Sequence, residues 1–130
     1  MDVDQPNAFR KTPLMTAAQF GLEGSARWLI GNGAHVNAVT EDTEMHNNGR
    51  TALHYAAASG SLPLIRLLVE HGASIDARDT VGGEAEYLGV KDTPGSQTPL
   101  DYLSGAGPVD APKLSEKDKA EAVRLLTVKR

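Results

Sequence analysis

The residues best suited to chemistry in this chain are one histidine and a short acidic group. His54 lies in the apolar stretch LHYAAASG, where catalysis would need a nucleophile or a carboxylate partner. The sequence offers no nucleophile-elbow pattern that could supply one. Asp42, Glu44 and His46 alternate, so an extended backbone would place all three on one face, where they could hold a divalent cation. No second cluster completes a coordination shell, and solvated or partner-facing charge is the favoured interpretation.

The glycine-rich stretches give no better support for an enzyme. Gly82-Gly83 and Gly105-Ala106-Gly107 lack the strand-to-helix context and the following Lys-Ser/Thr of a phosphate loop. Glu84 and Glu86 are too close in sequence to be assigned as an acid and a base. We therefore expect no catalysis and no cofactor.

The amino-acid composition excludes several further classes of function. The chain has 130 residues, a net charge of −4 and a pI near 5.5, so it lacks the basic cluster that nucleic acid requires. The absence of cysteine excludes disulfides and thiolate metal sites. No apolar run approaches the roughly 18 residues of a membrane span, and the N-terminus has no signal-peptide core. The compartment stays open, with the cytoplasm favoured over secretion.

The element that must position these residues runs from Arg50 to Ala77, RTALHYAAASGSLPLIRLLVEHGASIDA. Its pattern predicts two short helices separated by Gly60, the second ending at Gly72, followed by an extended segment. Ser61 is expected to cap the second helix, with Pro63 in its first turn. This segment resembles an ankyrin repeat, whose signature is T-P-L-H-x-A on a period of about 33 residues. Only Ala52 departs from that motif.

The same pattern occurs three times. Thr12-Pro13-Leu14 opens one copy and Thr98-Pro99-Leu100 another, so the intervals around Thr51 are 39 and 47 residues (51 − 12 and 98 − 51). The predicted organisation is a single domain, 1–130, with repeats at about 3–35, 36–74 and 75–130. The excess over 33 residues predicts long fingers at 35–50 and 74–97. Val3 lies nine residues before Thr12, as in the finger of a preceding ankyrin repeat. The two hypotheses are that the chain is a fragment of a longer array, or that its first finger serves directly as a cap.

The helices and core follow from this register. Repeat one is expected to have helices from Pro13 to about Phe20 and from Glu23 to Asn32, with Trp28 in the core. The last helix is expected to run from a capping box at Ser115 and Asp118 to about Lys129. Its buried side is expected to comprise Ala122, Val123, Leu125 and Leu126, while Lys117, Lys119, Glu121 and Arg124 are solvated.

The resemblance implies an all-α ankyrin solenoid of helix-turn-helix units with β-hairpin-like fingers and a concave side that binds proteins. It also implies that His54 is structural. The implied contact positions precede each motif threonine and each first glycine: Lys11, Gln19, Phe20, Arg50, Ala58, Ser59 and Gln97. Tyr55 and Tyr102 are expected to line the same groove. The fingers add Glu41, Asp42, Glu44, Glu84, Glu86 and Tyr87, whose acidity predicts a partner with a basic or polar patch.

The function expected from this resemblance is a non-catalytic protein–protein interaction module, monomeric on its own, with no nucleic acid and no membrane insertion. Two alternatives remain open. The lengthened fingers suit an inhibitor or immunity-type protein that blocks a partner enzyme. The register of Asp2-Val3-Asp4 suits an accessory or targeting domain of a larger enzyme or effector.

Overall fold

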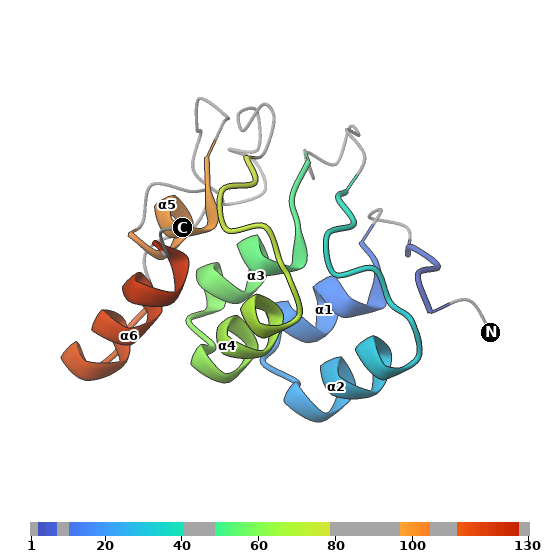
Figure 1. Ribbon diagram of the computed structural model, residues 1–130, viewed down its shortest axis with the longest axis horizontal. Helices are drawn as coiled ribbons and strands as arrows, with labels where there is room; N and C mark the ends of the chain where they lie inside the picture. The colour runs from blue at the N-terminus through green and yellow to red at the C-terminus, as the bar shows by residue number, and fades with distance from the viewer. Residues whose placement is uncertain (1–2, 8–10, 41–48, 79–96, 105–111, 128–130) are drawn as a thin grey trace.

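The computed structural model describes residues 3–7, 11–40, 49–78, 97–104 and 112–127 (Figure 1). These residues form three helix pairs, which we number one to three in chain order. The helices are α1 (Pro13–Gln19), α2 (Glu23–Gly31), α3 (Ala52–Ser59), α4 (Leu62–Glu70), α5 (Pro99–Leu103) and α6 (Glu116–Leu126). The described residues contain no β-strand, only an isolated antiparallel bridge between Val39 and Thr51. The predicted all-α fold is confirmed.

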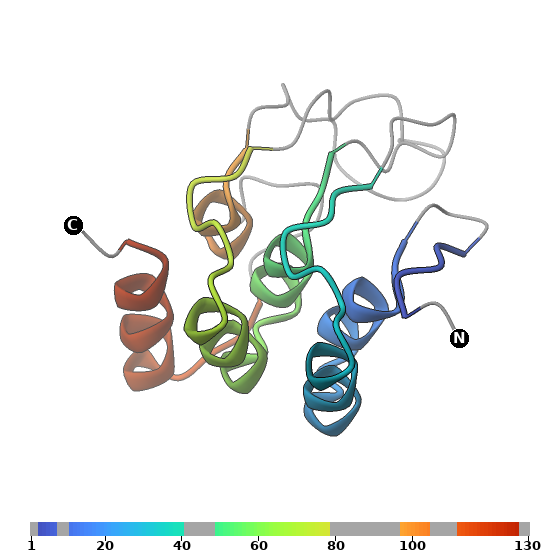
Figure 2. The same cartoon turned by 45° about the vertical axis from the view of Figure 1, so that its right-hand side comes forward.

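The six helices form two layers. The first helices of the three pairs lie side by side, with α3 in contact with both α1 and α5 (Figures 1 and 2). The second helices form the other layer, where α4 contacts α2 and α6. Each pair therefore covers its apolar side with its neighbours, which is how a solenoid builds one continuous core from units that could not fold alone.

Each first helix begins at a threonine in extended conformation. The hydroxyl oxygens of Thr12, Thr51 and Thr98 accept the backbone N–H three residues on, at 3.2–3.3 Å. The side chain at that third position accepts the threonine N–H in return, and it is Met15, His54 and Asp101 in turn. A thioether, an imidazole and a carboxylate thus complete the same local box, so the motif histidine can be replaced without losing the helix start.

The helix ends match the glycine positions, but two predicted caps differ. Gly60 and Gly72 have φ angles of +71° and +89°, the left-handed geometry expected after a helix. Ser61 lies at the N-cap of α4 as predicted, but its side chain makes no capping hydrogen bond. The predicted position is therefore correct and the predicted capping bond is wrong. Ser115 does accept the N–H of Asp118 at 3.1 Å, without the return bond of a full box among the described residues.

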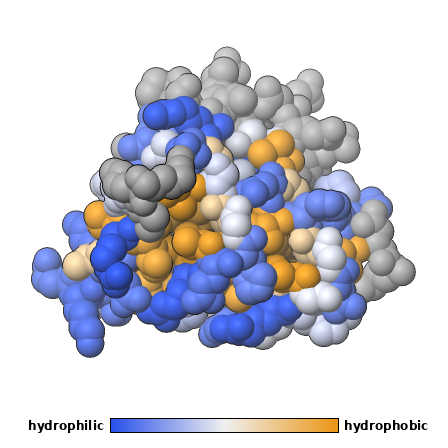
Figure 3. Space-filling view, in the orientation of Figure 1, coloured by the Kyte–Doolittle hydropathy of each residue, from blue (hydrophilic) through white to orange (hydrophobic). Residues whose placement is uncertain are grey.

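The core is centred on helix pair two, whose apolar side chains are covered from both sides. Seven of them are at most 1% exposed: Leu53, Ala56, Ala57, Leu64, Ile65, Leu67 and Leu68. Trp28, expected in the core, is instead 52% exposed, because α2 has a neighbouring helix on one side only. Val123 is 36% exposed on α6, the outermost helix at the other end. Hydrophilic residues lie along the lower edge of the stack and the outer side of α6 (Figure 3).

Candidate protein-binding surface

The predicted contact residues fall into two rows along the first-helix layer. Residues that precede a motif threonine form an inner row, Lys11, Arg50 and Gln97. Residues at the ends of α1 and α3 form an outer row, Gln19, Phe20, Ala58 and Ser59. Because α1, α3 and α5 lie side by side, the stack brings these positions together from segments far apart in sequence. The resemblance implies that this side is concave, and we call the two rows together the concave strip.

Arg50 is the buried member of the inner row. The residue is 7% exposed, its Nε donates to the Tyr102 hydroxyl at 2.7 Å, and its backbone N–H donates to Thr40 Oγ1 at 2.9 Å. The guanidinium carbon lies 6.0 Å from the centroid of the Tyr102 ring. Tyr102 is itself 1% exposed. Arg50 and Tyr102 therefore fix helix pair two against pair three, and their predicted direct contact with a partner stays a prediction.

The same pairing of a cation with the tyrosine of the next helix pair occurs one step earlier. Lys11 Nζ lies 4.8 Å from the centroid of the Tyr55 ring and donates to Gln19 Oε1. Desolvation by burial, and then the charge of Arg50, lower the pKa of Lys11. Burial raises the pKa of Tyr55, and the nearby Arg50 opposes that rise. A cation held over an aromatic face contributes roughly 0.5–2 kcal/mol. These two pairs hold Lys11 and Arg50 against tyrosines of the next helix pair, and we call the inner row the platform.

His54 is confirmed as a structural residue. It is completely buried, and its Nδ1 accepts the Thr51 N–H at 3.1 Å, which leaves the proton on Nε2. Nε2 donates to the carbonyl oxygen of Gln97 at 2.8 Å. The ring also packs edge-on against Tyr102, with centroids 4.8 Å apart. Nδ1 thus holds the start of helix pair two, and Nε2 holds the start of helix pair three.

The outer row is the accessible part of the strip. Phe20 is 66% exposed, the most exposed large hydrophobic residue described. Ser59 is exposed, while Gln19 and Ala58 are half-buried. The Ser59 hydroxyl donates to the Ala18 carbonyl oxygen at 3.2 Å, so helix pair two is tied to helix pair one along this row. An aromatic side chain on a fixed helix end is the type of residue that dominates binding energy at interfaces.

The finger residues predicted to bind a partner lie outside the described part of the chain. These are Glu41, Asp42, Glu44, Glu84, Glu86 and Tyr87, together with His46 and the two glycine-rich stretches. The base of the first finger is described. There the Thr40 N–H donates to the Arg50 carbonyl at 2.9 Å and the Gly49 N–H donates to the Thr40 carbonyl at 3.1 Å. Thr40, 1% exposed, was not anticipated from the sequence, because an isolated threonine in a loop gives no signal of burial.

Hydrogen bonds between successive fingers also escaped the sequence reasoning. The His35 N–H donates to Asp4 Oδ1 at 3.0 Å, and the Ser74 N–H donates to Asn37 Oδ1 at 2.8 Å. Asn37 also donates to the Gly72 carbonyl at 3.1 Å. The spacing of Asp4 and Asn37, 33 residues, was the available signal. Partial burial raises the pKa of Asp4, but hydrogen bonds from His35 more than offset it and leave the pKa below its ordinary value.

The described residues contain no further cluster that suggests chemistry. An open cleft of about 750 Å³ lies between the N-terminal segment, the first finger and His71. Two of its lining residues, Asp4 and His35, are bonded to each other, with 2.6 Å between Asp4 Oδ2 and His35 Nδ1. Within the described ranges there is no group of three or more His, Asp or Glu residues placed to hold a metal ion. None of the described helices is both long and apolar enough to cross a bilayer.

These features define a helical repeat protein. Its first helices are capped by threonine and joined through buried side chains, and their ends form one surface strip. The chain belongs to the ankyrin-repeat family. The family model described as "Ankyrin repeats (3 copies)" matches residues 1–79, and "Ankyrin repeats (many copies)" matches residues 53–111. Ankyrin repeats generally serve as protein–protein interaction modules and generally do not catalyse reactions.

The similar proteins are longer than the region that aligns with this chain. The Transient receptor potential cation channel subfamily A member 1 homolog of Caenorhabditis elegans is 31% identical over 84 residues, covering 65% of this chain and 6% of that protein. Ankyrin repeat and SAM domain-containing protein 6 of Mus musculus is 36% identical over 103 residues, covering 71% and 11%. Protein phosphatase 1 regulatory subunit 27 of Mus musculus is 36% identical over 63 residues, covering 48% and 40%. The chain therefore spans less than half the length of each.

Proposed function

We propose that this chain is a non-catalytic binding module that holds another protein across the concave strip. The observation that carries the proposal is the arrangement of Phe20, 66% exposed, beside an inner row that two cation–tyrosine pairs keep in place. A rigid surface loses little conformational entropy on binding, so an exposed aromatic on it can contribute most of its burial to affinity.

The partner's chemistry follows from the two parts of this surface. Phe20 calls for an apolar pocket, in which an aromatic side chain becomes fully desolvated. The acidic finger residues, among them Glu41, Asp42 and Glu44, call for a basic or polar patch beside that pocket. Association steered by exposed charges slows as salt rises, whereas burial of the aromatic mainly sets the dissociation rate.

The test uses affinity capture from the native source followed by binding measurements with the purified partner. The baits are the chain, Phe20→Ala, and a chain with residues 41–46 and 80–92 replaced by short turns. Val123→Ala, which also removes an exposed apolar side chain but on α6, is the matched control. Loss of an interface hot spot costs about 2 kcal/mol or more, so Phe20→Ala should weaken affinity by about 30-fold or more at an unchanged thermal midpoint. Equal affinity for Phe20→Ala and Val123→Ala would contradict the proposal.

A second candidate, regulation of an enzyme, is favoured by one relative. That protein is named as a regulatory subunit of protein phosphatase 1, and this chain covers 40% of it. If the captured partner is an enzyme, its activity should be titrated with the chain. Saturable inhibition with the same midpoint as binding supports an inhibitory role for the fingers or the strip. Binding without any change in enzyme activity would reject the inhibitory role and retain only the proposed role as an interaction module.

A further inference from the structure

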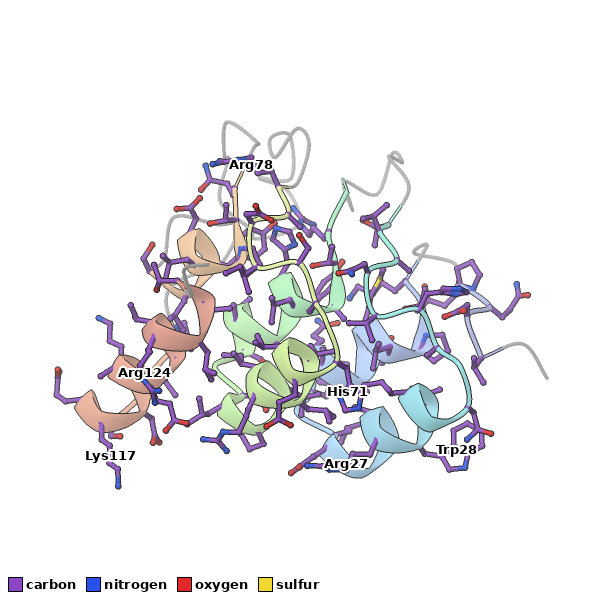
Figure 4. The ribbon with its side chains drawn as sticks, viewed as in Figure 1. Arg27, Trp28, His71, Arg78, Lys117 and Arg124 are labelled. Atoms are coloured by element: carbon purple, nitrogen blue, oxygen red, sulfur yellow. The ribbon has the colours of Figure 1, made fainter. Side chains whose placement is uncertain are left out.

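The N-terminal end of the stack is an exposed apolar face. Trp28 on α2 is 52% exposed, and Leu22 in the turn before α2 is 48% exposed. Figure 4 shows Trp28 on the side of α2 that points away from α4 and out of the stack. The opposite end carries charge instead, since Lys117 and Arg124 project from α6 in the same view. The two ends of the solenoid therefore have different chemistry.

The internal repeat shows what such positions contact when a neighbour is present. Each residue of helix pair one corresponds to the residue of pair two whose number is 39 higher, which is the interval from Thr12 to Thr51. Trp28 then corresponds to Leu67, which is 1% exposed, and Leu22 corresponds to Ser61. Ser61 lies against the preceding pair, because a Cβ on Gly21 would meet its Oγ at 3.4 Å. Leu67 is thus buried in pair two, whereas its counterpart Trp28 is open in pair one, where no described helix lies on the outer side of α2.

The N-terminal segment already occupies the place of a preceding finger. Asp4 accepts the His35 N–H at 3.0 Å, just as Asn37 accepts the Ser74 N–H at 2.8 Å. Val3, the residue before Asp4, packs against the core as Val36 does before Asn37. Residues 3 and 4 therefore have the contacts of a finger whose own helix pair would lie directly over Trp28 and Leu22.

We propose that this end face is a repeat interface, and that its occupant is an ankyrin-type helix pair encoded on the same polypeptide immediately before residue 1. The interface continues the one that joins pair one to pair two, and the docked finger supplies the connection in register. A second copy stacked head to tail would bring the charged α6 end onto Trp28, with loss of solvation of those charges. The inference concerns a different face from the concave strip and is independent of the function proposed for that strip.

The only tryptophan in the chain is the natural probe of this face. Three proteins are compared: the chain, the chain preceded in frame by a copy of its own residues 50–72, and the same extension with Ala57→Pro and Leu67→Pro in the copy. The copied segment contains no tryptophan, so fluorescence excited at the red edge reports Trp28 alone. Circular dichroism measures how much helix each extension adds.

The intact extension is expected to shift Trp28 emission to the blue and to lower its acrylamide quenching constant several-fold. The proline-containing extension should leave both readouts as in the unextended chain. Trp28 that stays open to quencher beside the intact extension would overturn the proposal, whether or not the added helices form. Val123→Ser at the other end of the stack should leave the emission unchanged.

Two further measurements decide the occupant. In the coding sequence upstream of residue 1, a threonine motif, an alanine pair and two glycines in this register would support the proposal, and a frame without a helix pair would overturn it. Sedimentation of the unextended chain tests a second copy. A concentration-dependent dimer that blue-shifts Trp28 and is lost in Trp28→Ser would assign the face to self-association instead.

Discussion

Gly60, between α3 and α4, is the position at which a single added methyl group should disturb the stack most. Its φ of +71° disfavours any side chain, and a Cβ built there would lie 2.5 Å from the Cβ of Pro112 and 3.0 Å from its Cγ. Pro112 belongs to the connection that leads into α6, so the turn of helix pair two and the last helix pair meet at this glycine. Gly60→Ala combines backbone strain with a backbone-anchored clash.

The two contributions can be estimated separately. A non-glycine residue in the left-handed region costs about 1–2 kcal/mol, and overpacking against an ordered neighbour costs about 1–3 kcal/mol. Gly60→Ala should therefore destabilise the fold by about 2–5 kcal/mol. Gly72→Ala, with φ of +89° and open space around the Cβ, should cost only the first part, about 1–2 kcal/mol.

The assay is urea denaturation of both variants, with Gly24→Ala as a matched control in α2. Gly24 has ordinary helical geometry and nothing near its Cβ, so alanine there should stabilise the chain by up to about 1 kcal/mol. Pro112→Gly removes the atoms in the clash, and combined with Gly60→Ala it should recover about 1–3 kcal/mol in a double-mutant cycle. If Gly60→Ala costs no more than Gly72→Ala, the contact between helix pair two and Pro112 does not exist and the reasoning fails.

Three further predictions test the core, the platform and an exposed ion pair. Leu68→Ala should cost about 2–5 kcal/mol, since Leu68 is completely buried, and a loss below about 0.5 kcal/mol in urea denaturation would mean that the register of α4 is wrong. Tyr102→Phe removes one acceptor of the buried Arg50 guanidinium and should cost about 1.5–3 kcal/mol in the same assay. The hydrogen bond from Arg66, at 2.5 Å, is the main cause that lowers the pKa of Glu121 below its ordinary 4.5. A lowered carboxyl pKa stabilises the fold above the unfolded value, so the thermal midpoint of Glu121→Gln should lie below that of the chain at neutral pH, and this difference should disappear as pH falls below 4.5.

The local structure could be predicted from the sequence because its determinants are close in the chain. A threonine and the side chain three residues on fix the start of each first helix, and a glycine of positive φ follows α1 and α3. Thr51, His54 and Gly60 all lie within ten residues. The same logic identified the start at Thr98, although Asp101 replaces the motif histidine. Asp101 accepts the same N–H that His54 accepts, so the substitution preserves the local bond.

What the sequence could not provide is how deeply each side chain lies. The register places Trp28 where Leu67 is buried, but burial depends on a neighbouring helix pair and not on the position alone. Arg50 was predicted from its position as an exposed contact residue. Its partner Tyr102 lies 52 residues further on, and only the stacking of α3 against α5 brings the two together. Phe20 is exposed as expected, because it follows the last residue of α1 and projects from the end of the helix.

The bond from His54 to the Gln97 carbonyl has a consequence for how this chain can change over evolution. The chain between Ala73 and Gln97 connects helix pairs two and three, and both of these residues are fixed: the Ala73 N–H donates to the Leu68 carbonyl at 2.9 Å, and Gln97 is held by His54. Closing a connection between fixed ends costs only about 0.6 kcal/mol more for each doubling of its length. Insertions, deletions and wholesale exchange of this segment should therefore leave α5 in register. The same frame can then acquire new specificities by grafting, while selection on its helices stays the same.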